Sequence, residues 1–342
     1  MGKMKLIKEK ITDFIKRMGE FGEYSVYVPQ IIEGGSSFLP VSEGSSPDFS
    51  LPNTKMPAKS LFYPQTETLF RYRDGETAIQ TPGEANEMIV LGIRPCDARA
   101  LSITDNLFSW DPADPYYKGK RDKATLFGFA CSKPCTNCFC TSVGGGPASK
   151  EGLDALVTDL GDSYHIEVLT EKGVKICQLA GDILQIADDG DSQAAEKIHA
   201  EAAGKFARSA EVRDIPSALP SLWDNDLWKK NADACLSCGI CTFLCPTCHC
   251  FDIQDEVEGI EGRRCRAWDS CMFREYSVHG SGHNPRPTRR ERTRNRINHK
   301  YSYFVEKFGV ISCVGCGRCI NLCPVNIDIL NILSQIKEAG TL

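Results

Sequence analysis

Cysteines at fixed spacing constrain this chain more than any other feature of its sequence. Residues 235 to 252 read CLSCGICTFLCPTCHCFD, and residues 313 to 324 read CVGCGRCINLCP. Both stretches contain C-x2-C-x2-C-x3-C-P, in which three thiolates on one tight loop reach three irons of a cubane and the fourth points toward a second cluster. The two copies, here called the first and second ferredoxin runs, predict two 4Fe–4S clusters.

The fourth cysteine of each run is expected to bind the cluster of the other run. The predicted ligands are Cys235, Cys238, Cys241 and Cys323 for the first cluster, and Cys313, Cys316, Cys319 and Cys245 for the second. A pair of zinc sites is the alternative, since C-x2-C pairs also bind zinc. Zinc explains neither the third cysteine of each loop nor the proline after the fourth. Gly239, Gly315 and Gly317 also fit iron–sulfur loops, which need positive φ angles.

The distance between the two runs indicates the architecture around them. A compact ferredoxin places its runs roughly thirty residues apart, whereas 67 residues separate Cys245 from Cys313. This spacing resembles the helical dicluster ferredoxins that serve as iron–sulfur subunits of reductases. We therefore predict a mainly helical, dicluster ferredoxin-like domain over residues 221–342.

The preceding residues, 1–220, read as an α/β domain, which makes the whole chain α+β. The segments EMIVLGIRPCDARALSITDNLF and ATLFGFACSKPCTNCFC each predict a buried strand that runs into a cysteine-bearing loop. Other expected elements are a helix over 3–20, a strand at YSVYVPQI, a loop over 33–60, strands at LVTDLG, YHIEVLT and VKICQLA, and a helix over 193–213. Loops at strand ends commonly carry function in α/β architecture.

Four cysteines on the two strand-end loops predict a third cluster. They are Cys96, Cys131, Cys138 and Cys140. Cys135 is an alternative to one of them, and a zinc site or an unligated redox thiol also remains open. Cys177 stands alone in an apolar segment and is expected to be a buried small hydrophobe.

Four further cysteines lie near the ferredoxin runs without a clear assignment: Cys248, Cys250, Cys265 and Cys271. They could bind one more metal, with His249, His283 or His299 as additional ligands. The simpler interpretation is that these cysteines pack around the clusters and shape their access and potential.

Charge is distributed unevenly along the chain. The formal net charge is −5, yet residues 261–300 hold eleven Lys and Arg against four Asp and Glu. Arginines there could stabilise negatively charged clusters, raise their potentials, or dock an acidic partner. Binding of nucleic acid is a weaker interpretation, because the basic stretch lies inside the cluster domain and the rest of the chain is acidic.

Several classes of protein are excluded by missing signals. The N-terminus has no apolar signal-peptide core, no stretch has the ~20 apolar residues of a membrane span, and tight cysteine runs favour a cytoplasmic location. No dinucleotide fingerprint, P-loop or serine nucleophile elbow is present. We therefore expect no catalytic residue and no substrate chemistry on this chain alone.

A known family carries the same motifs in the same order. They are GIRPCDARAL, CSKPCTNCFCTSVGGGP, CLSCGICTFLCPTCHCFD, RAWDSCMF, GHNPRP and CVGCGRCINLCPVNIDI. From about residue 60 onward the chain resembles the beta subunit of cytoplasmic sulfhydrogenases and the corresponding iron–sulfur subunit of anaerobic sulfite reductase. The resemblance implies the third cysteine set named above and equivalents of Cys248, Cys250 and Cys271, whereas Cys265 is peculiar to this chain.

The resemblance also implies a function. Members of this family are iron–sulfur subunits of hetero-oligomeric complexes that pass electrons between a flavin-containing, diaphorase-like subunit with FAD and a catalytic subunit. Hydrogenase, sulfite reductase and heterodisulfide reductase systems could all use such a module. The alternative is a reductase subunit in which an unusual cysteine-bound cluster reduces a disulfide or a sulfur species.

Overall fold

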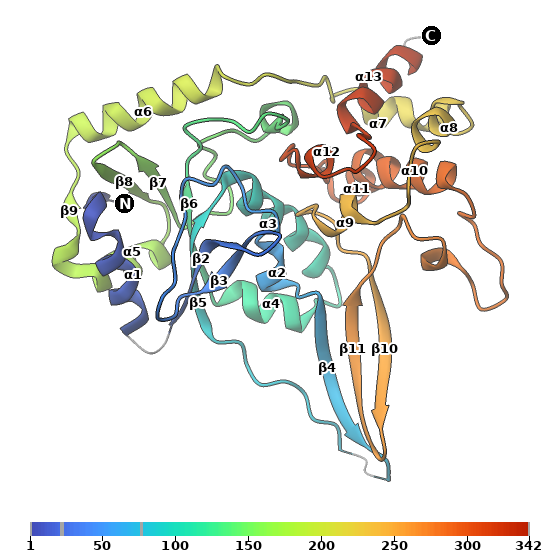
Figure 1. Cartoon of the computed structure of the whole chain (residues 1–342), viewed down its shortest axis with the longest axis horizontal. Coiled ribbons are helices and arrows are strands. Elements are labelled where there is room, and N and C mark those ends of the chain that lie inside the picture. Colours follow the sequence, from blue (N-terminus) through green and yellow to red (C-terminus); the bar gives the residue numbers. More distant parts are fainter. Residues whose placement is uncertain (1, 21–23, 76–77, 341–342) are drawn as a thin grey trace. The chain divides into compact units, whose positions relative to one another are not determined.

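The computed structural model describes residues 2–20, 24–75 and 78–340, and it divides into two compact units (Figure 1). The first unit comprises Met1–Phe62, Ala85–Arg208 and Val314–Cys316, and the second comprises Tyr63–Glu84, Ser209–Cys313 and Gly317–Leu342. Each unit thus includes a short segment from a distant part of the sequence. A division of the chain near residue 220 stays a prediction.

The first unit is built on a mixed sheet of eight strands in the order β3-β2-β5-β6-β7-β8-β1-β9. The strands are β1 (Lys3–Ile7), β2 (Tyr24–Ile32), β3 (Gly35–Pro40), β5 (Glu87–Ile93), β6 (Ala124–Phe129), β7 (Ala155–Asp159), β8 (Ser163–Val168) and β9 (Gln185–Ile186). β2 pairs with β5, β5 with β6, and β6 with β7 in parallel. The other strand pairs of this sheet are antiparallel. The parallel pairing of β5 with β6 brings the loops after both strands to one edge of the sheet.

Helices cover both faces of this sheet. They are α1 (Ile11–Glu20), α2 (Lys59–Phe62), α3 (Pro95–Phe108), α4 (Pro115–Asp122), α5 (Glu171–Ala180) and α6 (Asp189–Ala203). Figure 1 shows α1 and α5 on one side of the sheet and α3 and α4 on the other. On β5, Ile89 and Leu91 pack into the core under α1 and α5, while Val90, on the opposite face, is also fully buried. Burial on both faces explains why β5 and β6 read as continuous apolar runs.

Some elements of the first unit differ from the sequence prediction because tertiary pairing outweighs local periodicity. Residues 3–20 form a strand before the helix, since β1 pairs with β8 and Leu6 is buried opposite Tyr164. The segment VKICQLA lies in α5, whose first turn is capped by the Thr170 hydroxyl, and not in a strand. The predicted loop over 33–60 contains β3 and the start of α2, and the helix predicted to reach residue 213 ends at Ala203.

The second unit combines short helices with a three-stranded antiparallel sheet in the order β10-β11-β4. Its strands are β4 (Thr66–Arg73), β10 (Phe251–Glu258) and β11 (Glu261–Trp268). Its helices are α7 (Ile215–Ala218), α8 (Leu227–Ala232), α9 (Ile240–Phe243), α10 (Arg289–Asn298), α11 (Phe304–Phe308), α12 (Arg318–Asn321) and α13 (Ile329–Gly340), with a π-helical turn at His299–Tyr303. The chain is therefore α+β, as predicted, but the β10–β11 hairpin was expected as helix and loop.

Candidate metal centres

One pocket of the second unit is lined by all four cysteines predicted for the first cluster. Cys235, Cys238 and Cys241 come from the first ferredoxin run, and Cys323 comes from the second. Cys319 and Arg296 line the same pocket, here called the first cysteine pocket. Each iron of a 4Fe–4S cluster takes one thiolate, so donors distributed around a pocket fit this group.

The thiols surround the pocket and do not converge on one point. Within residues 2–20, 24–75 and 78–340, no three side chains of His, Cys, Asp or Glu are placed to hold a single metal ion. Four thiolates are the donor set of a 4Fe–4S cluster, and a zinc site remains the alternative.

Backbone geometry directs N–H groups at the sulfurs of this pocket. The N–H of Ser237 donates to the Cys235 sulfur over 3.4 Å, and the N–H of Ile327 donates to the Cys323 sulfur over 3.2 Å. Gly239, with φ of 76°, directly precedes α9 as its N-cap and has no room for a Cβ, which would lie 2.8 Å from two phenylalanine rings. Positive φ at this glycine lets the loop wrap tightly and aim its donors inward.

Two of the thiols predicted for the second cluster, those of Cys245 and Cys313, lie near a buried lysine. Lys300 is 2% exposed, and its Nζ lies 3.2 Å from Cys245 Sγ, 3.1 Å from Thr247 Oγ1 and 3.0 Å from the Ser312 carbonyl oxygen. Burial opposes the charge, yet the nearby cysteine sulfurs outweigh it and hold the pKa of Lys300 above its ordinary value. A permanent cation therefore lies against the sulfur of Cys245.

Cys313 and Cys319 lie near Cys245. We call these three residues the second cysteine group. Burial, followed by the charges of Cys245 and Cys313 among others, raises the pKa of Cys319 to about 11. Burial, followed by the nearby Cys313 thiol, raises the pKa of Tyr301, whose side chain is fully buried in the π-helical turn. The fourth predicted member, Cys316, belongs to the first unit.

The arginine-rich helix α10 is a scaffold for the first cysteine pocket. Its N-terminus carries a capping box of Thr288 and Glu291. Arg289 donates to the carbonyl oxygen of Cys235 over 2.7 Å, and Arg296 donates to that of Cys241 over 3.4 Å. These contacts fix the loop backbone and leave positive charge beside the thiols.

Part of the basic stretch is buried. Arg292, Arg294 and Arg296 are each less than a tenth exposed, and Arg266 is 4% exposed and bonded to Glu67. These buried guanidinium groups suit stabilisation of the cysteine loops and of negative charge within them. The other arginines of residues 261–300 are half-buried or exposed, so docking of an acidic partner stays a prediction.

A second pocket gathers the cysteines of the first unit. It is lined by Cys96, Cys131, Cys135, Cys138, Cys140 and Cys316, together with Pro52, Asn53 and Phe206. We call it the N-terminal cysteine pocket. All four residues predicted for a third cluster meet here, and so does the alternative Cys135. Cys316 of the second ferredoxin run also lines this pocket, which the spacing of that run does not indicate.

Arg94 positions the two loops that carry these cysteines. It is 8% exposed and lies between the end of β5 and Cys96. Its guanidinium donates to the carbonyl oxygens of Phe129 and Ala130 at the end of β6, over 3.2 and 3.1 Å, and to those of Phe49 and Leu51. Sequence reasoning missed this role because its partners are distant in sequence.

Gly315 fixes residues 314–316 beside Cys140. Its carbonyl oxygen accepts from the Phe139 N–H over 2.7 Å, and the Asn53 side chain donates to the Cys316 carbonyl oxygen over 3.2 Å. With φ of 63°, a Cβ at Gly315 would lie 2.6 Å from the Phe139 carbonyl carbon. Only glycine allows this close backbone approach.

The unassigned cysteines separate into different environments. The thiol of Cys245, followed by burial, raises the pKa of Cys248. The nearby Cys271 is the main reason that the pKa of Cys250 falls to about 6. Cys265 lies buried on β11, 3.9 Å from the Thr68 hydroxyl.

The lone Cys177 and the histidines lie elsewhere. Cys177 packs in the core of the first unit, and its side chain is 8% exposed. Ring contacts of 5.4 Å between centroids pair His249 with His299 and His279 with His283. None of the predicted histidine candidates therefore joins a convergent metal-binding group within the described residues.

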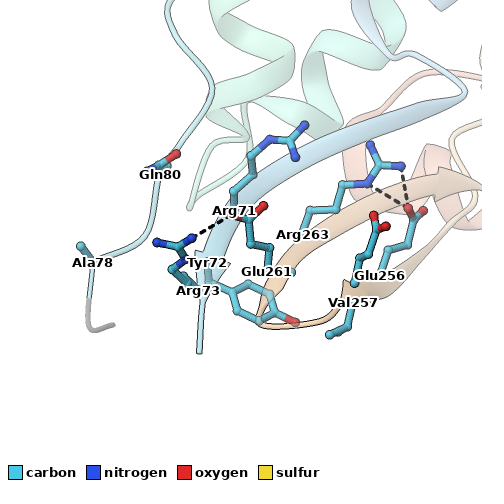
Figure 2. Close-up of a pocket in the computed structure, with 11 residues that line it drawn as sticks. Arg71, Tyr72, Arg73, Ala78, Gln80, Glu256, Val257, Glu261 and Arg263 are labelled. Carbon is cyan, nitrogen blue, oxygen red and sulfur yellow. Dashed lines mark hydrogen bonds and ion pairs between the residues drawn. The ribbon is translucent and has the colours of Figure 1, made fainter. Parts of the chain in front are cut away.

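A further pocket lies at the far end of the hairpin, away from the cysteines. Figure 2 shows Arg71 and Arg73 of β4 facing Glu261 and Arg263 across it. Arg263 pairs with Glu256 over 2.6 Å and Arg73 with Glu261 over 3.3 Å. Most of its charges are thus neutralised within the pocket, which none of the sequence motifs indicates.

Comparison with known proteins agrees with the cysteine arrangement. Residues 234–327 match the family described as 4Fe-4S dicluster domain. Sulfhydrogenase 2 subunit beta of Pyrococcus furiosus is 31% identical over 98% of this chain and 98% of its own length. The beta subunit of F420-dependent formate dehydrogenase from Methanocaldococcus jannaschii is 24% identical over 52% of this chain and 40% of its own length. In the described part of the chain, no helix has the length and apolar character needed to span a membrane.

Proposed function

This chain belongs to the family of iron–sulfur beta subunits that includes sulfhydrogenase 2 subunit beta, and we propose that it relays single electrons between a flavin-containing partner and a catalytic one. It is an iron–sulfur electron-transfer subunit of an oxidoreductase complex. The names of its relatives support a catalytic partner of the hydrogenase or formate dehydrogenase type. We propose FAD on a diaphorase-like partner, a cytoplasmic location, and no catalytic residue on this chain.

One observation carries the proposal: thiols from both ferredoxin runs line the first cysteine pocket. We assign Cys235, Cys238, Cys241 and Cys323 to the first 4Fe–4S cluster, and Cys313, Cys316, Cys319 and Cys245 to the second. For a third cluster we assign Cys96, Cys131, Cys138 and Cys140. When bound, such clusters each accept and release one electron at a time.

The residues around these thiols have supporting tasks. Arg289 and Arg296 hold the first loop through its carbonyl groups, while Lys300 places a cation at Cys245. Cys316, assigned to the second cluster, also lines the N-terminal cysteine pocket of the first unit.

Iron counting on the full-length chain, isolated anaerobically in its complex, tests the ligand assignment. Three cubanes predict about twelve irons per chain. Replacing Cys96 by Ser should lower the count by about four and remove one electron paramagnetic resonance (EPR) signal, while Cys265→Ser, outside all proposed ligand sets, should leave both unchanged. About eight irons in the unaltered chain would reject the third cluster, and zinc in place of iron would reject the relay.

A further inference from the structure

β10 forms an open edge of the three-stranded sheet in the second unit. The strand order β10-β11-β4 leaves β10 paired on one side only, and all eight of its residues, Phe251–Glu258, are exposed. Figure 1 shows the three strands extending together as an arm from the helices of this unit. Proteins usually shorten, bulge or cover such an edge, because its free N–H and C=O groups can pair with another strand.

The register of the hairpin shows which backbone groups of β10 face the open edge. The N–H of Asp269 donates to the Cys250 carbonyl oxygen over 3.0 Å, so these two residues face each other across the hairpin. The N–H of Trp268, one residue earlier, points away from β10 and donates to the Gln65 carbonyl oxygen over 2.8 Å. Because these directions alternate along an antiparallel ladder, Phe251, the partner of Trp268, directs its N–H and C=O groups outward. Every second residue after Phe251 does the same.

The outward-facing residues after Phe251 are Ile253, Asp255 and Val257. The N–H of Ile253 donates to the carboxylate of its neighbour Asp252 over 2.9 Å, as expected for an amide that does not face β11. The N–H groups of Asp255 and Val257 are left for an added strand. Within residues 2–20, 24–75 and 78–340, β11 is the only strand that pairs with β10.

The side chains of β10 differ between the two faces of the sheet. Alternation along the strand puts Phe251, Ile253 and Val257 on one face, where they are 39%, 49% and 65% exposed. Asp252 and Glu258 lie on the other face. Charge alone would keep other strands away from an open edge, but a row of exposed apolar side chains is typical of a surface that binds another chain.

The charge of this edge indicates what kind of strand can bind. Of the four carboxylates on β10, those of Asp255 and Glu256 form ion pairs with arginines of β11, over 2.7 and 2.6 Å. Asp252 and Glu258 have no ion-pair partner among the residues that the structure describes. A second copy of this chain would place its own carboxylates on the same face, because outward-facing residues pair with outward-facing ones, and like charges would repel. A strand with Lys or Arg side chains would instead complete the ion pairs.

We propose that β10 is the docking edge for an extended strand of a partner subunit, and that this strand alternates apolar and basic side chains. Its backbone extends the sheet, its apolar side chains cover those of β10, and its Lys or Arg side chains pair with Asp252 and Glu258. The inference rests on the proposed function in so far as the chain works in a hetero-oligomeric complex. β10 continues from the segment that carries the first ferredoxin run, so the docked subunit is held to the same unit as that run.

Hydrogen–deuterium exchange tests the docking edge. Amide exchange is measured at residue resolution on the anaerobic native complex and on the full-length chain alone. We expect the outward N–H groups of Asp255 and Val257 to exchange about tenfold more slowly, or slower still, in the complex than in the isolated chain, and the inward N–H of Glu256 to be slow in both. Fast exchange at Asp255 and Val257 in the complex would overturn the proposal. Slow exchange there in the isolated chain would overturn it as well, because the chain or a second copy would then cover the edge.

A backbone variant tests strand addition directly. Val257→Pro removes one outward donor, and proline is tolerated on an edge strand where its missing N–H would face solvent. Native mass spectrometry of the complex should show the apparent affinity for the partner subunit reduced by about tenfold. Val257→Thr is the matched control, since it keeps the donor and the branched side chain, and it should reduce the affinity far less. Equal affinity in the proline variant and the unaltered protein would reject strand addition.

Charge reversal tests the chemistry of the partner and serves as a second variant should the proline variant not fold. In the complex that carries Asp252→Lys with Glu258→Lys, we expect the amide protection of β10 to be lost. Glu211→Lys with Asp214→Lys reverses two other exposed carboxylates of the second unit and should leave this protection unchanged. Protection that persists after reversal on β10 would show that the bound strand is not basic, and the proposal would fail.

Iron content and EPR spectra of the same samples separate the two proposals. Normal clusters in a complex whose β10 amides exchange freely would reject the docking edge and leave the proposed function standing. Protected β10 amides in a complex without iron–sulfur clusters would reject the electron relay and leave the docking edge.

Discussion

The ammonium group of Lys300 lies 3.2 Å from the sulfur of Cys245, and the lysine is 2% exposed. A cation buried against a cluster ligand stabilises the more negative, reduced state of that cluster. Lys300 thereby becomes the residue with the most direct electrostatic influence on the second cysteine group. The π-helical turn at His299–Tyr303, which contains it, sets this contact.

Removing the charge of Lys300 should lower the reduction potential of one cluster. We expect Lys300→Met to shift one midpoint by roughly 50–150 mV toward negative values, as the loss of one partly screened charge implies. EPR-monitored redox titration measures this shift. Lys300→Arg keeps the charge and should shift it far less; equal shifts in both variants would mean that packing, not charge, sets the potential.

Substitution of Gly315 should disrupt the N-terminal cysteine pocket. In Gly315→Ala the new Cβ meets the Phe139 backbone, which cannot move without displacing Cys140. We expect loss of about four irons per chain. Gly309→Ala is the matched control, because Gly309 has φ of 71° but nothing within 4 Å of its Cβ position. An equal iron loss in both would attribute the effect to backbone strain alone.

Arg94 should be needed for the same pocket. In Arg94→Lys the charge is kept, but a lysine ammonium group cannot donate to all four carbonyl oxygens that the arginine contacts. Some of these buried carbonyl oxygens would therefore lose their hydrogen-bond donor. We expect the free energy of unfolding to fall by about 2–4 kcal/mol and the iron count to fall by about four. Urea denaturation and iron analysis measure both. Arg121→Lys, which alters a partly exposed pair with Asp105, should change stability by less than about 1 kcal/mol.

His299 should make the protein less stable in acid. Burial, helped by Lys300 and Arg286, lowers the pKa of His299 from 6.5 to about 4. Between these values the unfolded chain binds a proton that the folded chain does not, so stability falls as pH falls through this window. The loss should reach at most about 3 kcal/mol.

A variant isolates this effect. His299→Gln should remove that part of the pH dependence, seen as a shallower slope of unfolding free energy against pH from 6.5 to 4. Parallel slopes for variant and unaltered protein would show that His299 titrates normally. The comparison between the two proteins cancels acid effects common to both.

The elements that could be predicted from sequence are those whose signal is local. β5, β6 and the start of α3 read correctly because strands buried on both faces are continuously apolar. β1 was missed because Met4 and Ile7 also fit a helical period, and only pairing with β8 decides between them. The hairpin was missed because residues 251–268 are rich in charged side chains, and only the pairing of β11 with both β10 and β4 identifies them as strands.

The candidate sites divide in the same way. Ferredoxin spacing is a local pattern, so the thiols of the first cysteine pocket could be named in advance. Arg94 and Lys300 could not, because each acts through residues far away in sequence, and a single arginine or lysine gives no periodic signal. The presence of Cys316 in the N-terminal cysteine pocket likewise depends on tertiary structure.

Residues Val314–Cys316 complete the first unit from near the end of the chain. Synthesis proceeds from the N-terminus, and domains generally fold as they emerge from the ribosome. The sheet of the first unit can form early, but its cysteine pocket lacks one wall until almost the whole polypeptide has been made. Nascent chains should therefore acquire iron at the N-terminal cysteine pocket late, even though its own cysteines are translated first.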